Sequence, residues 1–358
     1  MQSLGIHGPR AQSLLDFDSS HCGATALPMT FWLDLACTWA TPFFVPPTLV
    51  SGDSTSSAAM SQDATLKGEL SSACFCDEAG QWIDYQLFLP KCALKKPLPL
   101  VVMLHGHSQE LDSFITGTSM NEAAATAGFA VLYPAQSSQS HPQKCWHWFD
   151  PAHQHRDVGE PALLAALTRS VIQAHPIDAR KVYVAGLSAG GAMATVMGRE
   201  YPDLFAGVGV HSGLAAGVAH SVGSALASMR GDLPAAEAPS VAIPTIVFHG
   251  DADRMVHKDN GERVILACTG DVAAPEEHQL HVNQRTCTRR LHRRANGTVL
   301  AEHWIIHDAG HAWSGGSPRG SFADAQGPDA SAEMLRFFIE QSPARARKSV
   351  RRTSVLQH

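Results

Sequence analysis

The chain has 358 residues, of which 44% are hydrophobic and 17% are charged, as is ordinary for a soluble globular protein. Its formal net charge of −6 argues against a general nucleic-acid-binding protein, and no uninterrupted apolar run approaches the ~20 residues of a membrane-spanning helix. Twenty histidines are scattered along the sequence rather than set at metal-ligand spacing, so no metal and no organic cofactor is predicted.

Residues 1–65 are predicted to be a poorly ordered leader and linker, because Ser51–Ser61 is small and polar and offers little to bury. The most apolar part, Leu27–Val50, is a poor secretory signal, since it contains an aspartate and three prolines and only Arg10 precedes it. An export segment that starts at Met29 is the alternative. We expect one folded domain over residues 66–342 and a basic, mobile tail over residues 343–358.

Predicted strands and helices alternate through the folded part. Apolar or alternating runs predict strands, the first of them edge-lying, at Trp82–Leu89, Leu98–Leu104, Phe129–Tyr133, Val182–Ala185, Phe205–Val210 and Ile243–Phe248. Asn296-Gly297 predicts a hairpin between the strands Thr286–Arg293 and Thr298–Ile306. Helices are predicted at Ser119–Ala127, Glu160–His175, Ala192–Glu200 and Ala332–Glu340, and Ala215–Pro239 is either a helical excursion or a partial lid. This order favours an α/β fold with an open, mostly parallel sheet between two helical layers.

The pentapeptide Gly186–Gly190 fits the pattern G-x-S-x-G and lies between a predicted buried strand and a predicted helix. Small residues on both sides of Ser188 allow the chain to turn sharply from strand to helix. This context predicts that Ser188 is a nucleophile. The alternative is a glycine-rich turn that packs a helix closely on a sheet.

A serine hydroxyl is a weak nucleophile, so it needs a neighbouring base and a group that orients the base. Candidates follow two later strands, in the chain order serine, aspartate, histidine. We predict Asp253 as the acid because it lies further along its loop than Asp251, which is expected to cap the turn. We predict His311, beside a glycine, as the base, and His307 as a packed or surface histidine.

Negative charge that develops on the substrate carbonyl requires fixed hydrogen-bond donors. The backbone N–H of Ala189 is one predicted donor, and the backbone N–H of His107, in the loop after Leu98–Leu104, is the other. Gln109 is predicted to support this loop and to take part in substrate binding. Trp146 and Trp148 are interpreted either as a substrate wall or as core packing, and Trp313 is predicted to contact the substrate.

From about Leu70 to Glu340, the sequence resembles the esterase family of polyhydroxybutyrate (PHB) depolymerases. The resemblance is carried by the motifs LHGHSQ (104–109), MNEAA (120–124), CWHWFDP (145–151), GLSAGGAMA (186–194), HGDAD (249–253), GHAWSGG (310–316) and GPDASAEMLRFF (327–338). It implies an α/β-hydrolase fold and carboxylic-ester hydrolysis, with Ser188, Asp253 and His311 as the catalytic residues. It also implies an extracellular or periplasmic location, with a cytoplasmic one as the alternative.

The cysteines depart from the family pattern. The family usually reads LHGC where this chain has His107, and the resemblance implies that the missing cysteine would pair with Cys145. Cys145 therefore loses its expected partner. Among the eight cysteines, Cys268 and Cys287 are the pair that we expect to form a disulfide if the compartment is oxidising.

These observations predict a serine esterase that cleaves 3-hydroxyalkanoate esters, with a polyester or a small ester as its partner. Acetylxylan or feruloyl ester hydrolysis is the alternative, since the same family skeleton serves those substrates. A hydrolase fold that binds without catalysis is a less favoured alternative. No segment after Glu340 could fold into a polymer-binding domain, so soluble oligomers, amorphous polyester or small esters are expected rather than crystalline polymer.

Overall fold

The computed structural model describes residues 67–91, 96–232, 242–270 and 274–341. The predicted leader (1–65) and tail (343–358) lie outside these ranges, and so does part of the excursion predicted over Ala215–Pro239. None of the helices in the described ranges is both long enough and apolar enough to cross a bilayer.

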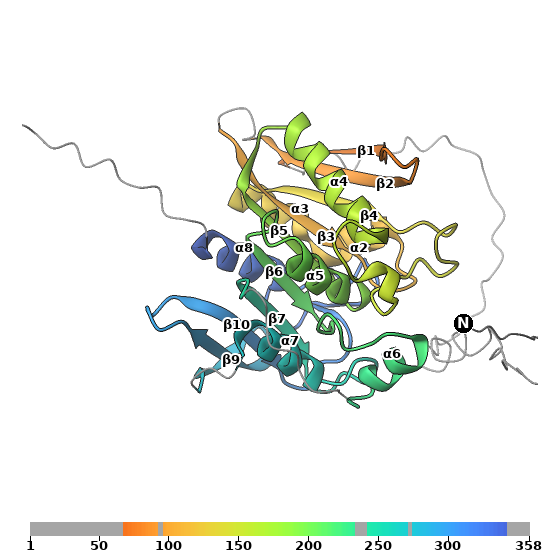
Figure 1. Ribbon diagram of the computed structural model, residues 1–358. Helices are drawn as coiled ribbons and strands as arrows, with labels where there is room; N and C mark the ends of the chain where they lie inside the picture. The colour runs from red at the N-terminus through yellow and green to blue at the C-terminus, as the bar shows by residue number, and fades with distance from the viewer. Residues whose placement is uncertain (1–66, 92–95, 233–241, 271–273, 342–358) are drawn as a thin grey trace, which may run out of the picture. The chain divides into compact units, whose positions relative to one another are not determined.

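A large sheet of ten strands, most of its central strands parallel, organises the described residues (Figure 1). Across the sheet the strands are β1 (Gly68–Cys76), β2 (Trp82–Pro90), β4 (Ala130–Ala135), β3 (Leu98–Leu104), β5 (Ile177–Leu187), β6 (Gly207–His211), β7 (Thr245–Gly250), β10 (Val299–Ile306), β9 (Arg285–Arg293) and β8 (Glu276–Val282). The six strands from β4 to β10 pair in parallel. Antiparallel strands extend the sheet at both edges.

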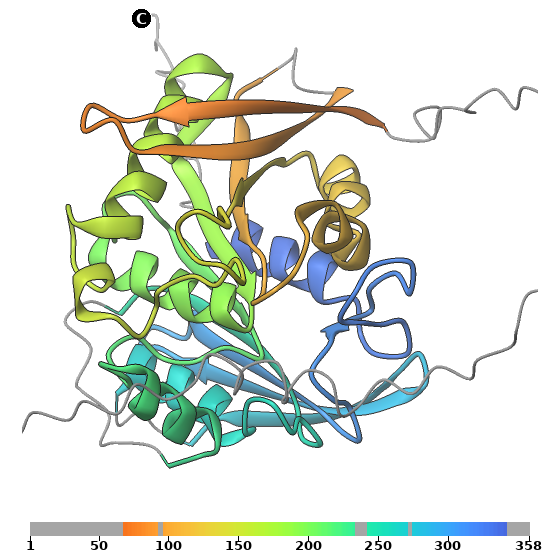
Figure 2. The ribbon, with the colours of Figure 1, turned by 90° about the vertical axis from the view of Figure 1, so that its right-hand side faces the viewer.

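Helices cover both faces of this sheet. The described helices of eight or more residues are α2 (Leu111–Thr118), α3 (Met120–Ala127), α4 (Gly159–Ala174), α5 (Ala189–Glu200), α6 (Val222–Met229), α7 (Asp259–Thr269) and α8 (Ala330–Gln341). One hydrophobic core joins the sheet to α4, α5, α6 and α7, and a second core joins its other face to α2, α3 and α8. Figure 2 shows this layering, with the green helices on one side of the sheet and the yellow and blue helices on the other. The predicted three-layer α/β fold is confirmed.

The central strands are apolar because both of their faces are buried. Every residue of β6 and of β7 is buried, and six of the seven residues of β3 are buried. Parallel strands between two helical layers have no solvent-facing side, so they read as continuous apolar runs rather than as alternating ones. This is why the sequence predicted them with nearly the observed bounds.

The edges of the sheet were predicted less well. Trp82–Leu89 was expected at an edge, but β1 pairs outside β2 along its whole length. Both β1 and β8, at the opposite edge, are largely exposed, and their polar residues give no clear hydrophobic pattern. Two short helices that the sequence did not predict, α2 and α7, also belong to the fold. The excursion after β6 contains α6.

The expected disulfide between Cys268 and Cys287 is wrong. Both thiols are free, and they lie in different cores, because Cys268 of α7 packs on one face of the sheet and Cys287 of β9 on the other. The Cys268 thiol donates a hydrogen bond to the carbonyl of Ile243 at 2.9 Å. Cys145 is also a free, buried thiol, as the substitution at His107 led us to expect.

Candidate active site

Ser188 occupies the sharp turn between β5 and α5. Its backbone has φ 56° and ψ −118°, a conformation that L-residues rarely adopt and that stores strain at functional turns. A Cβ atom on Gly190 would lie 2.1 Å from the carbonyl oxygen of Leu104, and one on Gly186 would lie 2.4 Å from the backbone of Gly190. Both positions therefore need glycine, because backbone segments approach each other closely there. Ser188 stands at the N-cap position of α5, but its side chain makes no capping hydrogen bond.

Asp253 and His311 form a hydrogen-bonded pair at the ends of β7 and β10. The His311 Nδ1 lies 2.7 Å from Asp253 Oδ2. Asp253 Oδ1 accepts the backbone N–H groups of Met255 and Val256, both at 2.9 Å, so the carboxylate is held from both sides. The exposed fraction is 0% for the Asp253 side chain and 6% for that of His311. The pair is therefore desolvated and fixed in orientation.

The electrostatics of the pair favour an ionised carboxylate. Burial by itself raises the pKa of Asp253, but the hydrogen bond from His311 and the nearby imidazoles lower it more, and the resulting pKa is about 2. His249 also faces this carboxylate, with its Nε2 3.5 Å from Asp253 Oδ2, and burial lowers the His249 pKa. Asp253 is thus a permanent negative charge at neutral pH, which would stabilise an imidazolium on His311.

Asp251 and His307 form a second pair of the same kind. Their hydrogen bond is also 2.7 Å long, and Asp251 Oδ1 accepts the backbone N–H of Asp308 at 2.8 Å. The other ring nitrogen of His307 lies 2.9 Å from the hydroxyl of Thr288. About a third of each side chain in this pair is exposed. The side-chain hydrogen bonds of Asp251 thus join its loop to the turn after β10 rather than capping its own turn, and both nitrogens of His307 are occupied.

The loop after β3 is built around Gln109, which is buried. The Gly106 backbone N–H donates to Gln109 Oε1 at 3.0 Å, and Gln109 Nε2 donates to the carbonyl of Ser321 at 3.0 Å. Gln109 therefore joins this loop to the segment that follows His311. Both atoms of the Gln109 amide are engaged in these hydrogen bonds. Gln109 therefore supports the predicted donor loop around His107.

The three tryptophans predicted to contact the substrate are all buried. This agrees with the core-packing alternative for Trp146 and Trp148, and Trp313 is packed in the core in the same way. The exposed fractions of Trp146, Trp148 and Trp313 are 0%, 5% and 1%. Trp146 Nε1 donates to the carbonyl of His105 at 3.0 Å, next to the predicted donor loop. Trp313 Nε1 donates to the hydroxyl of Ser331 at 3.1 Å, which anchors the loop of His311 to α8.

The sequence analysis missed His211, which connects the loops of Ser188 and His311. Its carbonyl accepts the backbone N–H of Ser188 at 2.9 Å, and its Nε2 accepts the backbone N–H of Ser314 at 2.9 Å. Burial, with the neighbouring imidazoles, lowers the His211 pKa to about 3, so the ring stays neutral and Nε2 stays an acceptor. Its position at the end of the strand after the elbow was the available signal.

Phe322 was also missed, because it lies between the motifs GHAWSGG (310–316) and GPDASAEMLRFF (327–338), in a loop without a pattern. Its ring meets the ring of His311 edge-on, with centroids 6.4 Å apart. Its backbone has φ 52°, and 41% of the residue is exposed. An exposed aromatic ring beside the predicted base offers apolar contact to a substrate in a way that the buried tryptophans do not.

A mostly parallel sheet, a serine in a strained strand-to-helix turn and a carboxylate–histidine pair at later strand ends define an α/β-hydrolase fold. The family model named Esterase PHB depolymerase matches residues 83–267. The chain belongs to this family, as its motifs led us to expect.

Among solved structures, an acetyl xylan esterase from Aspergillus awamori aligns with a TM-score of 0.60 and 19% identity, covering 75% of this chain and 99% of that one. An S-formylglutathione hydrolase from Agrobacterium tumefaciens aligns with a TM-score of 0.53 and 15% identity, covering 79% and 99%. At such identities the likeness establishes the fold alone.

Curated relatives carry the names of esterases and depolymerases. Poly(3-hydroxyalkanoate) depolymerase C from Paucimonas lemoignei is 30% identical over 60% of this chain and 54% of its own length. Feruloyl esterase B from Neurospora crassa is 33% identical over 36% of this chain and 43% of its own. A probable acetylxylan esterase A from Neosartorya fischeri is 34% identical over 38% and 36%. The matched part of the chain thus spans about half of the length of each of these relatives, or less.

Proposed function

We propose that this chain is a serine carboxylic-ester hydrolase that acts through an acyl-enzyme on Ser188. The observation that carries the proposal is the buried bond of 2.7 Å between Asp253 and His311, at the same edge of the sheet as the elbow. His211 supports it further, because one residue is bonded both to the Ser188 backbone and to the loop of His311.

The roles of the two imidazole nitrogens follow from the bond to Asp253. Since Nδ1 is committed to the carboxylate, Nε2 is the atom that would take the proton of the Ser188 hydroxyl. The serine oxygen forms a bond to the ester carbonyl carbon, and the bond to the alcohol oxygen breaks as His311 returns the proton to the leaving alkoxide. Water then attacks the acyl-enzyme by the same route, which releases the acid and restores Ser188.

We assign the oxyanion hole to two backbone N–H groups, those of Ala189 and His107. Ala189 is the first residue of α5, where the N–H has no acceptor within the helix and the helix dipole favours negative charge. His107 lies in the loop that Gln109 holds in place. Each such donor is typically worth about 3 kcal/mol of the reaction barrier.

For the substrate we propose esters of 3-hydroxyalkanoates, as oligomers or polymer, because the chain belongs to the Esterase PHB depolymerase family and resembles a depolymerase over 60% of its length. Acetylated or feruloylated polysaccharide esters are the second candidate. Two curated relatives named feruloyl esterase and acetylxylan esterase favour that candidate. The exposed ring of Phe322 would suit an apolar acyl or alkyl group in either case.

The test is a hydrolysis panel of 3-hydroxybutyrate oligomers, acetylated xylan, methyl ferulate and p-nitrophenyl acetate, with the Ser188→Ala variant beside the wild type. We expect the variant to lose about 10⁵- to 10⁶-fold in kcat and to fail to react with a fluorophosphonate probe. Wild-type protein that neither hydrolyses any ester nor reacts with the probe would favour a fold that binds without catalysis.

An extracellular or periplasmic location is part of the proposal, and it rests on the family alone. The five described cysteines, which are all free, give it no support: Cys74, Cys76, Cys145, Cys268 and Cys287. Cell fractionation together with sequencing of the mature amino terminus tests the location directly.

A further inference from the structure

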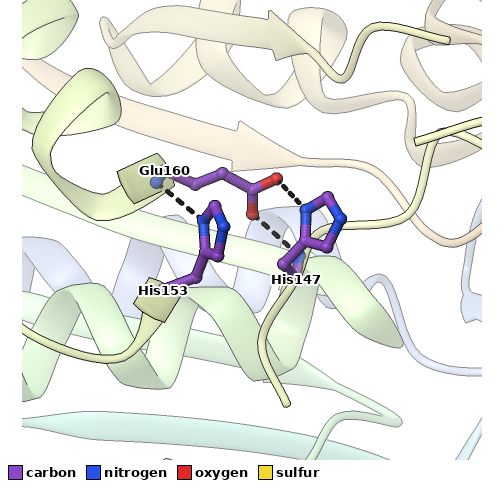
Figure 3. Close-up of side chains that lie close together, drawn as sticks. All are labelled: His147, His153 and Glu160. Atoms are coloured by element: carbon purple, nitrogen blue, oxygen red, sulfur yellow. Dashed lines mark hydrogen bonds and ion pairs between the residues drawn. The ribbon is translucent and has the colours of Figure 1, made fainter. Parts of the chain in front are cut away.

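Folding gathers two histidines and a glutamate at a place that the proposed reaction does not use. Figure 3 shows His147, His153 and Glu160 directed toward one another, from the loop after β4, from the short 3-10 helix Pro151–His153 and from the first turn of α4. One nitrogen of each ring and one carboxylate oxygen all lie within 4.8 Å of one another. The two rings stack with their centroids 4.8 Å apart.

The carboxylate holds this cluster together. His147 Nδ1 lies 2.6 Å from Glu160 Oε1, and the His147 backbone N–H donates to Glu160 Oε2 at 2.8 Å. The Glu160 backbone N–H donates to His153 Nδ1 at 3.0 Å. A cation bound by both side chains would therefore replace the hydrogen bond between His147 and Glu160 and move their two ligand atoms apart.

Groups around the cluster orient the ligands in the way that metal sites require. The side-chain amide of Gln136 donates to Glu160 Oε1, and it also donates to the carbonyl of Cys145 at 3.0 Å. Hydrogen bonds of this kind fix the direction of a ligating carboxylate. Glu160 is buried, whereas both histidines are partly exposed, so the cluster is neither a solvated surface patch nor sealed from solvent.

A cavity gives the cluster an entry path. It has a volume of about 480 Å³, and its walls include all three residues together with Trp82 of β2. Ser188, Asp253 and His311 do not line it, so the cluster is separate from the proposed catalytic residues. An ion bound here would keep one coordination position open to the cavity for a water molecule.

We propose that His147, His153 and Glu160 form a zinc site. Two imidazoles and one carboxylate with a water molecule are a donor set that Zn²⁺ accepts in tetrahedral geometry, with ligand distances near ~2.0–2.2 Å. Binding would release the proton between His147 and Glu160. It would also exchange the bond of His153 to the Glu160 amide for a bond to the ion, and water can satisfy that amide because it lies in the first turn of a helix.

The site would fasten a loop that supports the proposed oxyanion hole. Trp146, the neighbour of His147, donates to the carbonyl of His105, and His105 Nε2 accepts the backbone N–H of Gln136 at 3.0 Å. Zinc would thus connect the loop of His147 to α4, and the bond of Trp146 to His105 joins this loop to the segment that carries His107. A zinc ion bound here would link this loop to α4 while keeping one position for water. Its binding does not depend on whether Ser188 is a nucleophile.

The experiment measures metal binding and needs no activity. Full-length protein is stripped with EDTA and titrated with Zn²⁺ by calorimetry, and Co²⁺ absorption in the visible range reports the coordination geometry. We expect one Zn²⁺ per chain, a rise in Tm on binding, and a tetrahedral Co²⁺ spectrum that Zn²⁺ abolishes.

Two variants and a matched control test the assignment. His153→Ala and Glu160→Gln should each weaken Zn²⁺ binding by at least about tenfold, because each removes one ligand. His155→Ala should bind as the wild type does, since His155 lies two residues from His153 but is exposed and outside the cluster. Glu160→Gln keeps the size of the side chain, so it still tests the assignment if His153→Ala does not fold.

Wild-type affinity and stoichiometry in both ligand variants would overturn the proposal, because the metal would then be bound at other histidines. Failure of the wild type to bind Zn²⁺, or preference for Mg²⁺ or Ca²⁺, would overturn it as well. Neither result would bear on the esterase proposal, which the hydrolysis panel tests separately.

Discussion

The two aspartate–histidine pairs at the ends of β7 and β10 have the same chemistry and differ in their surroundings. Asp253–His311 and Asp251–His307 both have a hydrogen bond of 2.7 Å from Nδ1. The first pair is almost completely buried, whereas the second is about a third exposed. A hydrogen bond between an imidazole and a carboxylate is therefore no sufficient sign of a catalytic pair.

The second ring nitrogen and the degree of burial separate the pairs. The His307 Nε2 lies 2.9 Å from the Thr288 hydroxyl, so that ring has no nitrogen left for a nucleophile. Burial also strengthens the interaction between a carboxylate and an imidazolium, which water screens at an exposed pair. We therefore expect variants of the two pairs to have very different effects, and paired substitutions of the histidines and of the aspartates test this.

The largest difference is expected between the two histidines. His311→Ala should lower kcat for a p-nitrophenyl ester by about 10⁵- to 10⁶-fold, because the serine loses its base. His307→Ala should leave kcat within about threefold of the wild type, since surface substitutions away from a site have small effects. Steady-state kinetics of both variants is the measurement. Similar losses of kcat in His311→Ala and His307→Ala would show that burial does not distinguish a catalytic pair from a structural one.

The two aspartates should differ in the same direction. Asp253→Asn should lower kcat by about 10⁴-fold, because an amide cannot stabilise the imidazolium and can favour the wrong tautomer of His311. Asp251→Asn should lower the free energy of unfolding by about 1 kcal/mol or less and leave kcat nearly unchanged, since that pair is partly exposed. Kinetics and urea unfolding are measured on both variants. A larger kinetic loss for Asp251→Asn would reverse our assignment of the acid.

The buried aspartate should also contribute to the pH dependence of stability. The pKa of Asp253 is about 2 in the folded chain, below its ordinary value of 3.8, so its contribution is present above about pH 4 and is lost as the pH falls through 2. The contribution amounts to about 2 kcal/mol. Urea unfolding between pH 5 and pH 2 should show wild type and Asp253→Asn converging toward low pH. A difference in the free energy of unfolding that stays constant over this pH range would contradict the expected contribution of Asp253.

The smallest effect is expected at Phe322, which contacts His311 from the exposed side. Phe322→Ala should raise KM for an ester with an apolar acyl group by about three- to tenfold and change kcat little, because it removes apolar contact surface and no reacting group. Val158→Ala is a matched control, since Val158 is a similarly exposed hydrophobic residue in the loop that precedes α4. Equal effects of the two variants would show that Phe322 does not contact the substrate.

The sequence by itself determined the central fold. The buried strands β3, β6 and β7 were predicted because parallel strands without a solvent-facing side have continuous apolar sequences. The elbow at Ser188 was predicted because so tight a turn requires glycines. The choice of Asp253 with His311 also came from chain order and strand ends. The hydrogen bond between them agrees with that choice, while their catalytic role stays a prediction.

Tertiary structure decided the features that depend on partners distant in the chain. The edge strand β1, the link through His211, the burial of Trp146 and the cluster of His147, His153 and Glu160 all arise when separate segments meet. The sequence shows these histidines only as members of a scattered set of twenty. Local sequence encodes the secondary structure of each segment, but the neighbours of a side chain are set by packing between segments, and so burial, hydrogen-bond partners and ligand geometry appear only in the folded chain.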